Sequence, residues 1–125
     1  MSLKNLRVLI MLIKQFEVWI ADLNPQIGTE TDKTRPVLVI QTNFLNKVDH
    51  PSTIICPITS NVEHNSDILR VHLGVGIANL NESSDIMIDQ IRSIDNKRLI
   101  KKIGNLPDRI TDKVKENIKI VLDLD

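Results

Sequence analysis

The chain is built from short apolar runs, rich in β-branched residues, that alternate with turns containing Gly, Pro, Asn and Asp. Runs of this length between turn residues are typical of β-strands. A set of short strands has to bury a common face, so the pattern favours a compact curled sheet or a small barrel. We expect strands at residues 16–23, 35–42, 53–58, 67–73, 86–94 and 99–103, with a short helical turn at 43–46.

The end of the chain carries a different pattern, because its apolar residues recur at helical spacing. The segment opens with Leu106-Pro107-Asp108. A proline near the first position and an aspartate in the first turn both favour a helix start. We therefore expect one C-terminal helix that packs on the sheet. Its apolar stripe comprises Ile110, Val114, Ile118, Val121 and Leu122.

The composition limits the possible functions. A length of 125 residues suits one domain with a real core. The formal net charge is zero, so no global basic field indicates nucleic acid, and any such site must be local. The single cysteine, Cys56, excludes an internal disulfide and suits a reducing cytosol. Because Cys56 lies inside an apolar run, we expect a buried, inert thiol rather than a nucleophile.

The N-terminal residues 6–13 are apolar, but Arg7 interrupts them and Lys14 follows. The segment is too short to span a membrane. It also lacks a small-residue cleavage site before Phe16, which argues against a signal peptide. We interpret residues 1–14 as an N-terminal extension that forms an added strand or a short helix, with Met11 as an alternative natural start. Residues 15–125 then form the barrel domain.

Arg35 is the first residue of an apolar run and follows the polar loop 24–34. A cation fixed at the mouth of a strand is a good ligand for a phosphate. Pro36 biases Arg35 toward an extended conformation, so its side chain leaves the sheet in a defined direction. Another apolar run ends in Thr59 and Ser60, and an arginine and a hydroxyl at two strand ends can converge on one phosphodiester. The alternative is a surface arginine beside a turn threonine, and spacing alone leaves both open.

Several motifs follow one another in a fixed order along most of the chain. They are Glu17-Val18-Trp19-x-x-Asp22-Leu23-x-Pro25, Gly28-Thr29-Glu30, Thr34-Arg35-Pro36-Val37-Leu38-Val39-Ile40, Pro57-Ile58-Thr59-Ser60, Asp89-Gln90-Ile91-Arg92-Ser93-Ile94-Asp95, Lys97-x-Leu99 and Ile103-Gly104-x-Leu106-Pro107. In this order and spacing, the chain from residue 16 to residue 122 resembles the MazF/PemK family of toxin endoribonucleases from bacterial toxin–antitoxin modules.

The resemblance implies a small SH3-like β-barrel of the MazF/PemK/CcdB type, a homodimer, and metal-independent cleavage of single-stranded RNA without a cofactor. It also implies a cognate antitoxin protein and a cytoplasmic location away from membranes. By the family's motifs, Arg35 is the main catalytic cation and Thr59 its hydroxyl companion. The residues expected to contact the substrate are Thr29, Glu30, Lys33, Thr34, Ser60, Asp89 and Gln90.

The chain departs from some members of the family at two positions. Those members have an arginine two residues before the acidic residue Asp89, where this chain has Met87, and a histidine where it has Thr29. The resemblance therefore favours an arginine–threonine mechanism over one with histidine, arginine and aspartate. The loop also has Asp32 where glycine is common, and aspartate adopts a left-handed conformation less readily than glycine.

The chemistry that the resemblance implies can be argued from RNA itself. Its 2′-hydroxyl attacks the adjacent phosphorus, which leaves a 2′,3′-cyclic phosphate and a 5′-hydroxyl. The enzyme has to align the reacting groups and stabilise the developing charge. Arg35 can do so with its bidentate fork, and Thr59 can donate to a phosphoryl oxygen or hold the 2′-hydroxyl. The sequence does not identify the group that accepts the proton.

The RNA-binding surface is expected in the loops at 26–33 and 61–67, which can read the base edges of an unpaired strand. The basic group Lys97, Arg98, Lys101 and Lys102 can hold the RNA backbone, or it can be a solvated face. Two other functions stay open. One is a CcdB-like toxin that poisons gyrase and binds protein rather than cutting RNA, and the other is a catalytically silent barrel that serves as a binding module.

Overall fold

The computed structural model describes residues 12–23, 29 and 33–125, which form seven strands, two α-helices and three short 3-10 turns. The strands are β1 (Glu17–Asp22), β2 (Thr34–Val39), β3 (Ser52–Thr59), β4 (Arg70–Leu73), β5 (Ser84–Met87), β6 (Arg92–Asp95) and β7 (Leu99–Asn105). The helices are α2 (Asn43–Asn46) and α3 (Asp108–Leu122), and the turns are η1 (Ile77–Asn79), η2 (Ile88–Gln90) and η3 (Asn96–Arg98). The mainly β fold with a C-terminal helix is confirmed.

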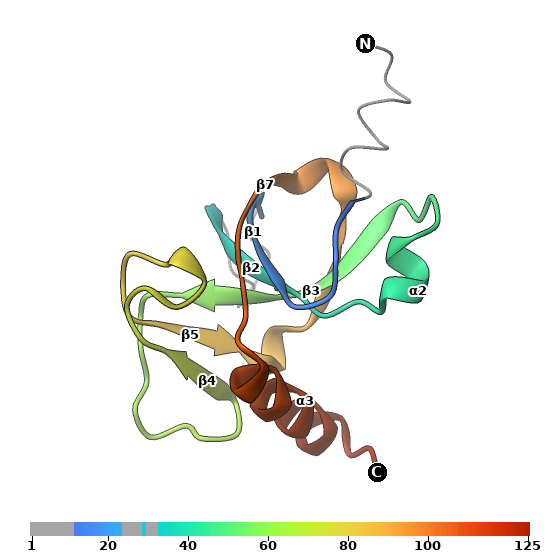
Figure 1. Ribbon diagram of the computed structural model, residues 1–125. Helices are drawn as coiled ribbons and strands as arrows, with labels where there is room; N and C mark the ends of the chain where they lie inside the picture. The colour runs from blue at the N-terminus through green and yellow to red at the C-terminus, as the bar shows by residue number, and fades with distance from the viewer. Residues whose placement is uncertain (1–11, 24–28, 30–32) are drawn as a thin grey trace.

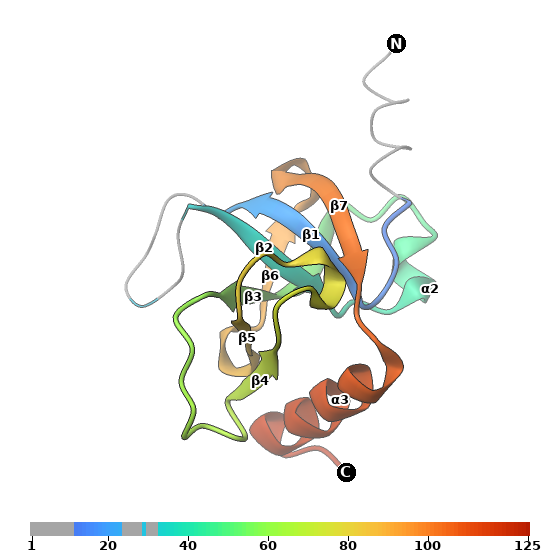
Figure 2. The same cartoon turned by 60° about the vertical axis from the view of Figure 1, so that its left-hand side comes forward.

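The strands form one antiparallel sheet that curls around a common interior (Figure 1). Its pairing path runs β4-β5-β3-β2-β1-β7, with β6 attached to β3. The two end strands of this path, β4 and β7, are not paired with each other, so the sheet stays open where a closed barrel was expected. Figure 2 shows α3 along one side of the sheet, where it packs near β4 and η2.

β3 is paired along both edges and organises the sheet. One edge pairs with β2, from Val37 opposite Pro57 to Val39 opposite Ile55. The other edge is divided, because β6 pairs with residues 52–55 and β5 with residues 58 and 59. The segment 86–94, which we expected to be one strand, is therefore broken by η2 into β5 and β6. Pro57 lies in the gap between the two ladders and has no backbone N–H to donate, which explains the break.

β4 is shorter than the sequence predicts. The strand expected at 67–73 begins at Arg70, because residues 67–69 form a turn in which the Arg70 N–H donates to the Ser66 carbonyl over 3.1 Å. Ile68 and Leu69 consequently stay exposed. The four residues that remain place Val71 and Leu73 in the core.

The C-terminal helix packs on the sheet as expected, with one exception in its stripe. Ile110 and Val114 are buried, and the buried line continues through Asn117, which donates to the carbonyl of Asp67 over 2.9 Å. Leu122 was expected on this stripe but is 52% exposed. It lies about 100° around the helix from its neighbour at 121, beside the buried line rather than on it.

The core has two clusters, and β2 contributes to both because its side chains alternate between the faces of the sheet. Leu38 belongs to the cluster under α3, whereas Val37 and Val39 belong to the second cluster. Cys56 is fully buried in the first cluster. Burial, together with the nearby negative charge of Asp89, raises the pKa of its thiol to about 12. The expectation of a buried, inert thiol is confirmed.

Of the N-terminal extension, residues 1–11 lie outside the described part of the chain, including the alternative start at Met11. Ile13 is 4% exposed and belongs to the second cluster, beside Trp19. The domain boundary after residue 14 stays a prediction. No described helix is long and apolar enough to cross a membrane.

Candidate active site

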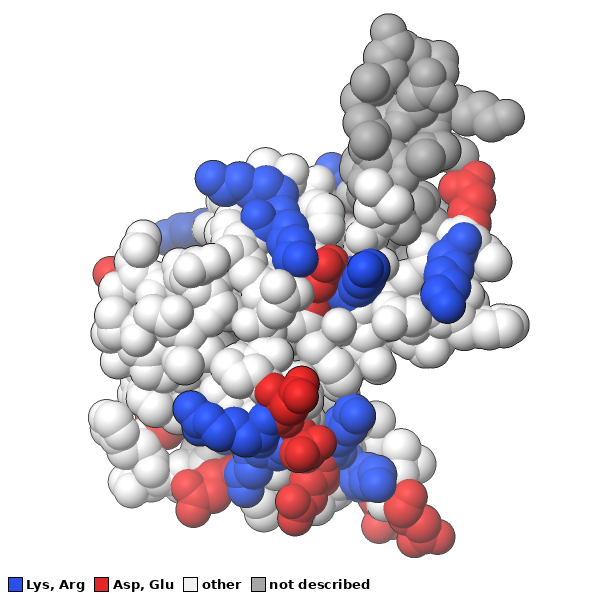
Figure 3. Space-filling view, viewed as in Figure 1, with Lys and Arg blue, Asp and Glu red and all other residues white. Residues whose placement is uncertain are grey.

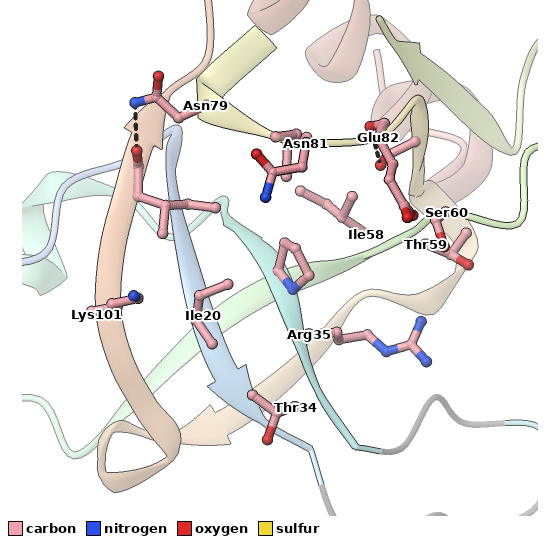
Figure 4. A pocket seen from close by; sticks show the side chains of 14 residues that line it. Ile20, Thr34, Arg35, Ile58, Thr59, Ser60, Asn79, Asn81, Glu82 and Lys101 are labelled. Carbon is pink, nitrogen blue, oxygen red and sulfur yellow. Dashed lines mark hydrogen bonds between the residues drawn. The ribbon is translucent and has the colours of Figure 1, made fainter. Parts of the chain in front are cut away.

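The sheet places Arg35 and Thr59 at neighbouring strand ends. The last ladder pair between β2 and β3 joins Val37 to Pro57. Continuing this antiparallel register by two residues sets Arg35 opposite Thr59, with both side chains on one face of the sheet. Figure 4 shows the guanidinium of Arg35 extended to the same side as Thr59 and Ser60. Spacing alone left open whether this arginine and this hydroxyl come together, and the fold brings both to one pocket.

Both residues line a pocket of about 710 Å³ beside the start of β2 and the end of β3. β2 and the end of β3 form one wall, β1 and β7 form the floor, and the loop after η1 forms the opposite wall (Figure 4). The described lining residues are Ile20, Thr34, Arg35, Pro36, Ile58, Thr59, Ser60, Asn79, Leu80, Asn81, Glu82, Ser84, Lys101 and Ile103.

The hydroxyl of Thr59 is oriented by its own turn. The backbone N–H of Asn61 donates to Thr59 Oγ1 over 3.1 Å. A hydroxyl group has one proton to donate in addition to its acceptor capacity. Because Oγ1 accepts the Asn61 N–H, its proton is directed away from that bond. The half-buried Thr59 can therefore present a hydrogen-bond donor to the pocket.

A buried carboxylate stabilises the turn that follows Thr59 at the end of β3. Asp85, opposite Thr59 in the β3–β5 ladder, is 1% exposed. It accepts the Glu63 N–H over 2.8 Å, forms an ion pair with Arg70 Nη1 at 3.3 Å, and lies within hydrogen-bond distance of His72 Nδ1 at 3.2 Å. Arg70 Nη1 also donates to the Asn61 carbonyl over 3.1 Å. Breaking a buried ion pair on one side is strongly destabilising, so this network holds the Thr59 turn in one geometry.

The opposite wall depends on a close contact between η1 and β7. Gly104 lies so close to Ala78 that an added Cβ would be 2.4 Å from the Ala78 carbonyl oxygen. Ala78 and Asn79 have positive φ angles of 52° and 63°. The Asn79 side chain donates to the Ile103 carbonyl over 2.7 Å, which ties the turn to β7. Figure 2 shows η1 in yellow beside β7.

Four of the site residues predicted from the sequence line this pocket, namely Thr34, Arg35, Thr59 and Ser60. Lys33 precedes them, exposed, with a positive φ of 67° and its carbonyl bound by the Leu23 N–H over 3.0 Å. Thr29 is exposed and is not among the described lining residues. Glu30 lies outside the described residues, as does Asp32.

Asp89 and Gln90 are not brought to the described wall of the pocket. They lie on η2, where Asp89 is close enough to influence the thiol of Cys56. The segment that carries them was expected to continue as a strand, and the break in the β3 edge directs it elsewhere. Their predicted contact with the substrate stays a prediction.

The predicted basic group is divided by the fold. Lys101 lines the pocket, whereas Lys102 pairs with the buried Glu17 at 2.9 Å and Arg98 donates to the Asp22 carbonyl over 3.1 Å. Figure 3 shows Lys and Arg side chains gathered over β7, while α3 carries both signs of charge. Positive charge is thus gathered locally in a protein whose formal net charge is zero.

Sequence reasoning missed the wall formed by Asn79, Asn81 and Glu82. These polar residues lie in a segment without a recognisable motif, and only the approach of η1 to β7 carries them to the pocket. The charged residues among the described lining are Arg35, Lys101 and Glu82. Two cations with a hydroxyl donor can hold a phosphodiester, and amide and carboxylate groups on the facing wall can contact the rest of a bound chain.

The chain is similar to known proteins in both sequence and fold. A family model described as PemK-like, MazF-like toxin of type II toxin–antitoxin system matches residues 14–122. The chain is 37% identical to Endoribonuclease EndoA of Bacillus subtilis (strain 168) over 114 residues, covering 91% of this chain and 97% of the relative. It is similar to the Mycobacterium tuberculosis toxin MazF-mt6, with a TM-score of 0.73 and 25% identity over 87% of this chain and 98% of that one. It is also similar to MazF from Deinococcus radiodurans, with a TM-score of 0.77 and 22% identity over 90% and 97% of the two chains.

Proposed function

This chain belongs to the PemK-like, MazF-like toxin family of type II toxin–antitoxin systems, and we propose that it is a toxin that cleaves single-stranded RNA. Membership of the family confirms the resemblance seen in the motifs. The observation that carries the proposal is the pocket that Arg35 and Thr59 line together from neighbouring ends of β2 and β3. A relative that covers nearly the whole chain is named an endoribonuclease, which supports the same activity.

The pocket suits an attack by the RNA on its own backbone. The 2′-hydroxyl attacks the adjacent phosphorus, the bond to the 5′-oxygen breaks, and the products end in a 2′,3′-cyclic phosphate and a 5′-hydroxyl. Arg35 holds two oxygens of the scissile phosphate through its planar fork and stabilises the extra charge of the transition state. Thr59 donates to a phosphoryl oxygen or holds the 2′-hydroxyl. Lys101 binds the RNA backbone at the rim.

Control by an antitoxin follows from the family to which the chain belongs. We propose that a cognate antitoxin protein covers the pocket and competes with RNA for Arg35. We also propose that the toxin acts in the cytoplasm, where mRNA is found, and that it is a homodimer. A CcdB-like action on gyrase is not favoured, because the match is to MazF/PemK toxins and an endoribonuclease.

The decisive experiment is incubation of the purified protein with a long single-stranded RNA in EDTA, followed by mapping of both product ends. We expect discrete cuts with cyclic phosphate and 5′-hydroxyl ends. A matched RNA with one 2′-deoxy nucleotide at a mapped cut site should resist cleavage there, since the nucleophile is missing. Arg35→Ala protein serves as the control for contaminating ribonuclease. Efficient cleavage at the deoxy position, or a requirement for a divalent metal, would contradict the mechanism.

A further inference from the structure

The proposed reaction requires an acceptor for the proton of the 2′-hydroxyl. The cations that line the pocket, Arg35 and Lys101, offer hydrogen-bond donors and no acceptor when charged. The hydroxyls of Thr59 and Ser60 are weak bases. Among the described lining residues, Glu82 is the one that carries a carboxylate, and an ionised carboxylate has only acceptor sites.

Glu82 is held on a fixed part of the pocket wall. In Figure 4 its side chain extends from the loop toward the end of β3, where Thr59 and Ser60 lie. Its carbonyl accepts the hydroxyl of Ser84 over 2.9 Å, and Leu80, two residues earlier, is 6% exposed and belongs to the main core cluster. The backbone on both sides of Glu82 is therefore anchored, while its side chain stays exposed to the pocket.

We propose that Glu82 is the general base of RNA cleavage. The inference rests on the proposed function and deepens it. The carboxylate of Glu82 takes the proton from the 2′-hydroxyl as the 2′-oxygen forms its bond to phosphorus. The bond between phosphorus and the 5′-oxygen breaks with its electron pair, and the leaving oxygen takes a proton from solvent water. Glu82 then returns its proton to solvent, and the enzyme is restored.

The geometry also assigns complementary roles to the two walls. Arg35 and Thr59 on the strand side bind the phosphate, and Glu82 on the loop side faces the attacking hydroxyl. An acid–base group that transfers a proton in the transition state typically contributes about 10² to 10⁴ in rate. It contributes little to binding, and a negative charge close to a phosphate opposes binding. Glu82 therefore differs from Arg35, whose loss should weaken binding and cleavage together.

The test compares Glu82→Gln with wild-type protein and with Glu116→Gln, a matched change on the exposed face of α3. Single-turnover cleavage of a short RNA containing one cut site gives the rate of the chemical step. Fluorescence anisotropy with the 2′-deoxy form of the same RNA gives binding without cleavage. We expect Glu82→Gln to lower the cleavage rate about 10² to 10⁴-fold, with binding of the deoxy RNA as tight as, or tighter than, that of wild type. Glu116→Gln should match wild type in both measurements.

The pH dependence gives a second readout that a structural role would not change. A reaction that depends on a carboxylate base should slow on acidification. The charged groups that share the described pocket lining with Glu82 are Arg35 and Lys101. Glu82→Gln should lose this dependence. The same profile is measured for Glu30→Gln, because the sequence predicts Glu30 as a substrate contact.

Each outcome decides the inference. A Glu82→Gln protein that cuts within tenfold of the wild-type rate, or that keeps the wild-type pH profile, overturns the assignment while the proposed function stands. If Glu30→Gln alone loses the decline of the cleavage rate at acidic pH, Glu30 rather than Glu82 is the general base. A wild-type protein that cuts none of the RNAs overturns both proposals. Circular dichroism and thermal unfolding should be unchanged in Glu82→Gln, because its side chain is exposed.

Discussion

Gly104→Ala tests whether the contact between η1 and β7 shapes the pocket. The new Cβ would lie 2.4 Å from the carbonyl oxygen of Ala78 and 2.6 Å from its carbonyl carbon, whereas ordinary contact begins near 3.4 Å. One of the two backbones therefore has to move by about 1 Å, because no flexible side chain can give way. Overpacking of this kind typically costs about 1–3 kcal/mol of unfolding free energy.

The displaced turn leads directly into the pocket wall that carries Asn81 and Glu82. A misplacement of about 1 Å at a reacting group can cost on the order of 10²-fold in rate. We therefore expect Gly104→Ala to lose stability and to cleave RNA far more slowly than the lost fraction of folded protein explains. Urea unfolding measures the first effect, and single-turnover cleavage well below the unfolding transition measures the second.

Gly74→Ala is the matched control, because a Cβ at Gly74 would meet nothing within 4 Å and its φ is not positive. That variant should be as stable as wild type or gain up to about 1 kcal/mol through the less flexible unfolded chain, with unchanged cleavage. If Gly104→Ala unfolds within about 0.5 kcal/mol of Gly74→Ala and cleaves at the wild-type rate, the contact has no role in shaping the site.

Three further predictions follow from single residues. Arg35→Ala should lower the cleavage rate by about 10² to 10³-fold with little change in urea unfolding, and Arg35→Lys should also be poor because the planar fork is lost; near-normal cleavage by the lysine variant would show that charge alone suffices. The Cys56 thiol, with its pKa raised to about 12 by burial and by the charge of Asp89, should resist iodoacetamide at neutral pH in the native protein and react after unfolding in urea, as followed by mass spectrometry; rapid native labelling would contradict this. Burial acts to raise the pKa of Glu17, but hydrogen bonds from Lys102, the Lys14 N–H and Trp19 outweigh it and hold the pKa below its ordinary value. A carboxyl whose pKa is lower in the folded than in the unfolded protein stabilises the fold at neutral pH, and this contribution is lost as the pH falls. The unfolding free energy, measured from neutral to acidic pH, should therefore decline less steeply in Glu17→Gln than in wild type. Equal slopes would refute the coupling.

Local patterns were sufficient to predict most of the elements. Alternating β-branched residues predicted strands, and the spacing of Ile110, Val114 and Ile118 predicted the helix, because these properties depend on neighbours within a few residues. The sequence also predicted Arg35 and Thr59 as residues at strand ends, since a residue at a strand end is positioned by its own strand. Their motifs, taken in order, identified the family that the comparisons show.

Strand pairing and close packing set which strand edges meet, and through them the rest of the site. The single strand expected at 86–94 is two strands, because Pro57 on the distant β3 interrupts the ladder. Asp85 reaches Arg70 and the Thr59 turn only through strand pairing, and Glu82 reaches the pocket only because Gly104 admits η1 against β7. Most of the strands, the C-terminal helix and the position of Arg35 and Thr59 at strand ends could be predicted from the sequence, because these depend on local backbone preference and side-chain alternation. Their meeting in one pocket depends on the register between β2 and β3. The opposite wall depends on contacts between residues far apart in the chain, and register and close packing settle these only when the whole sheet has formed.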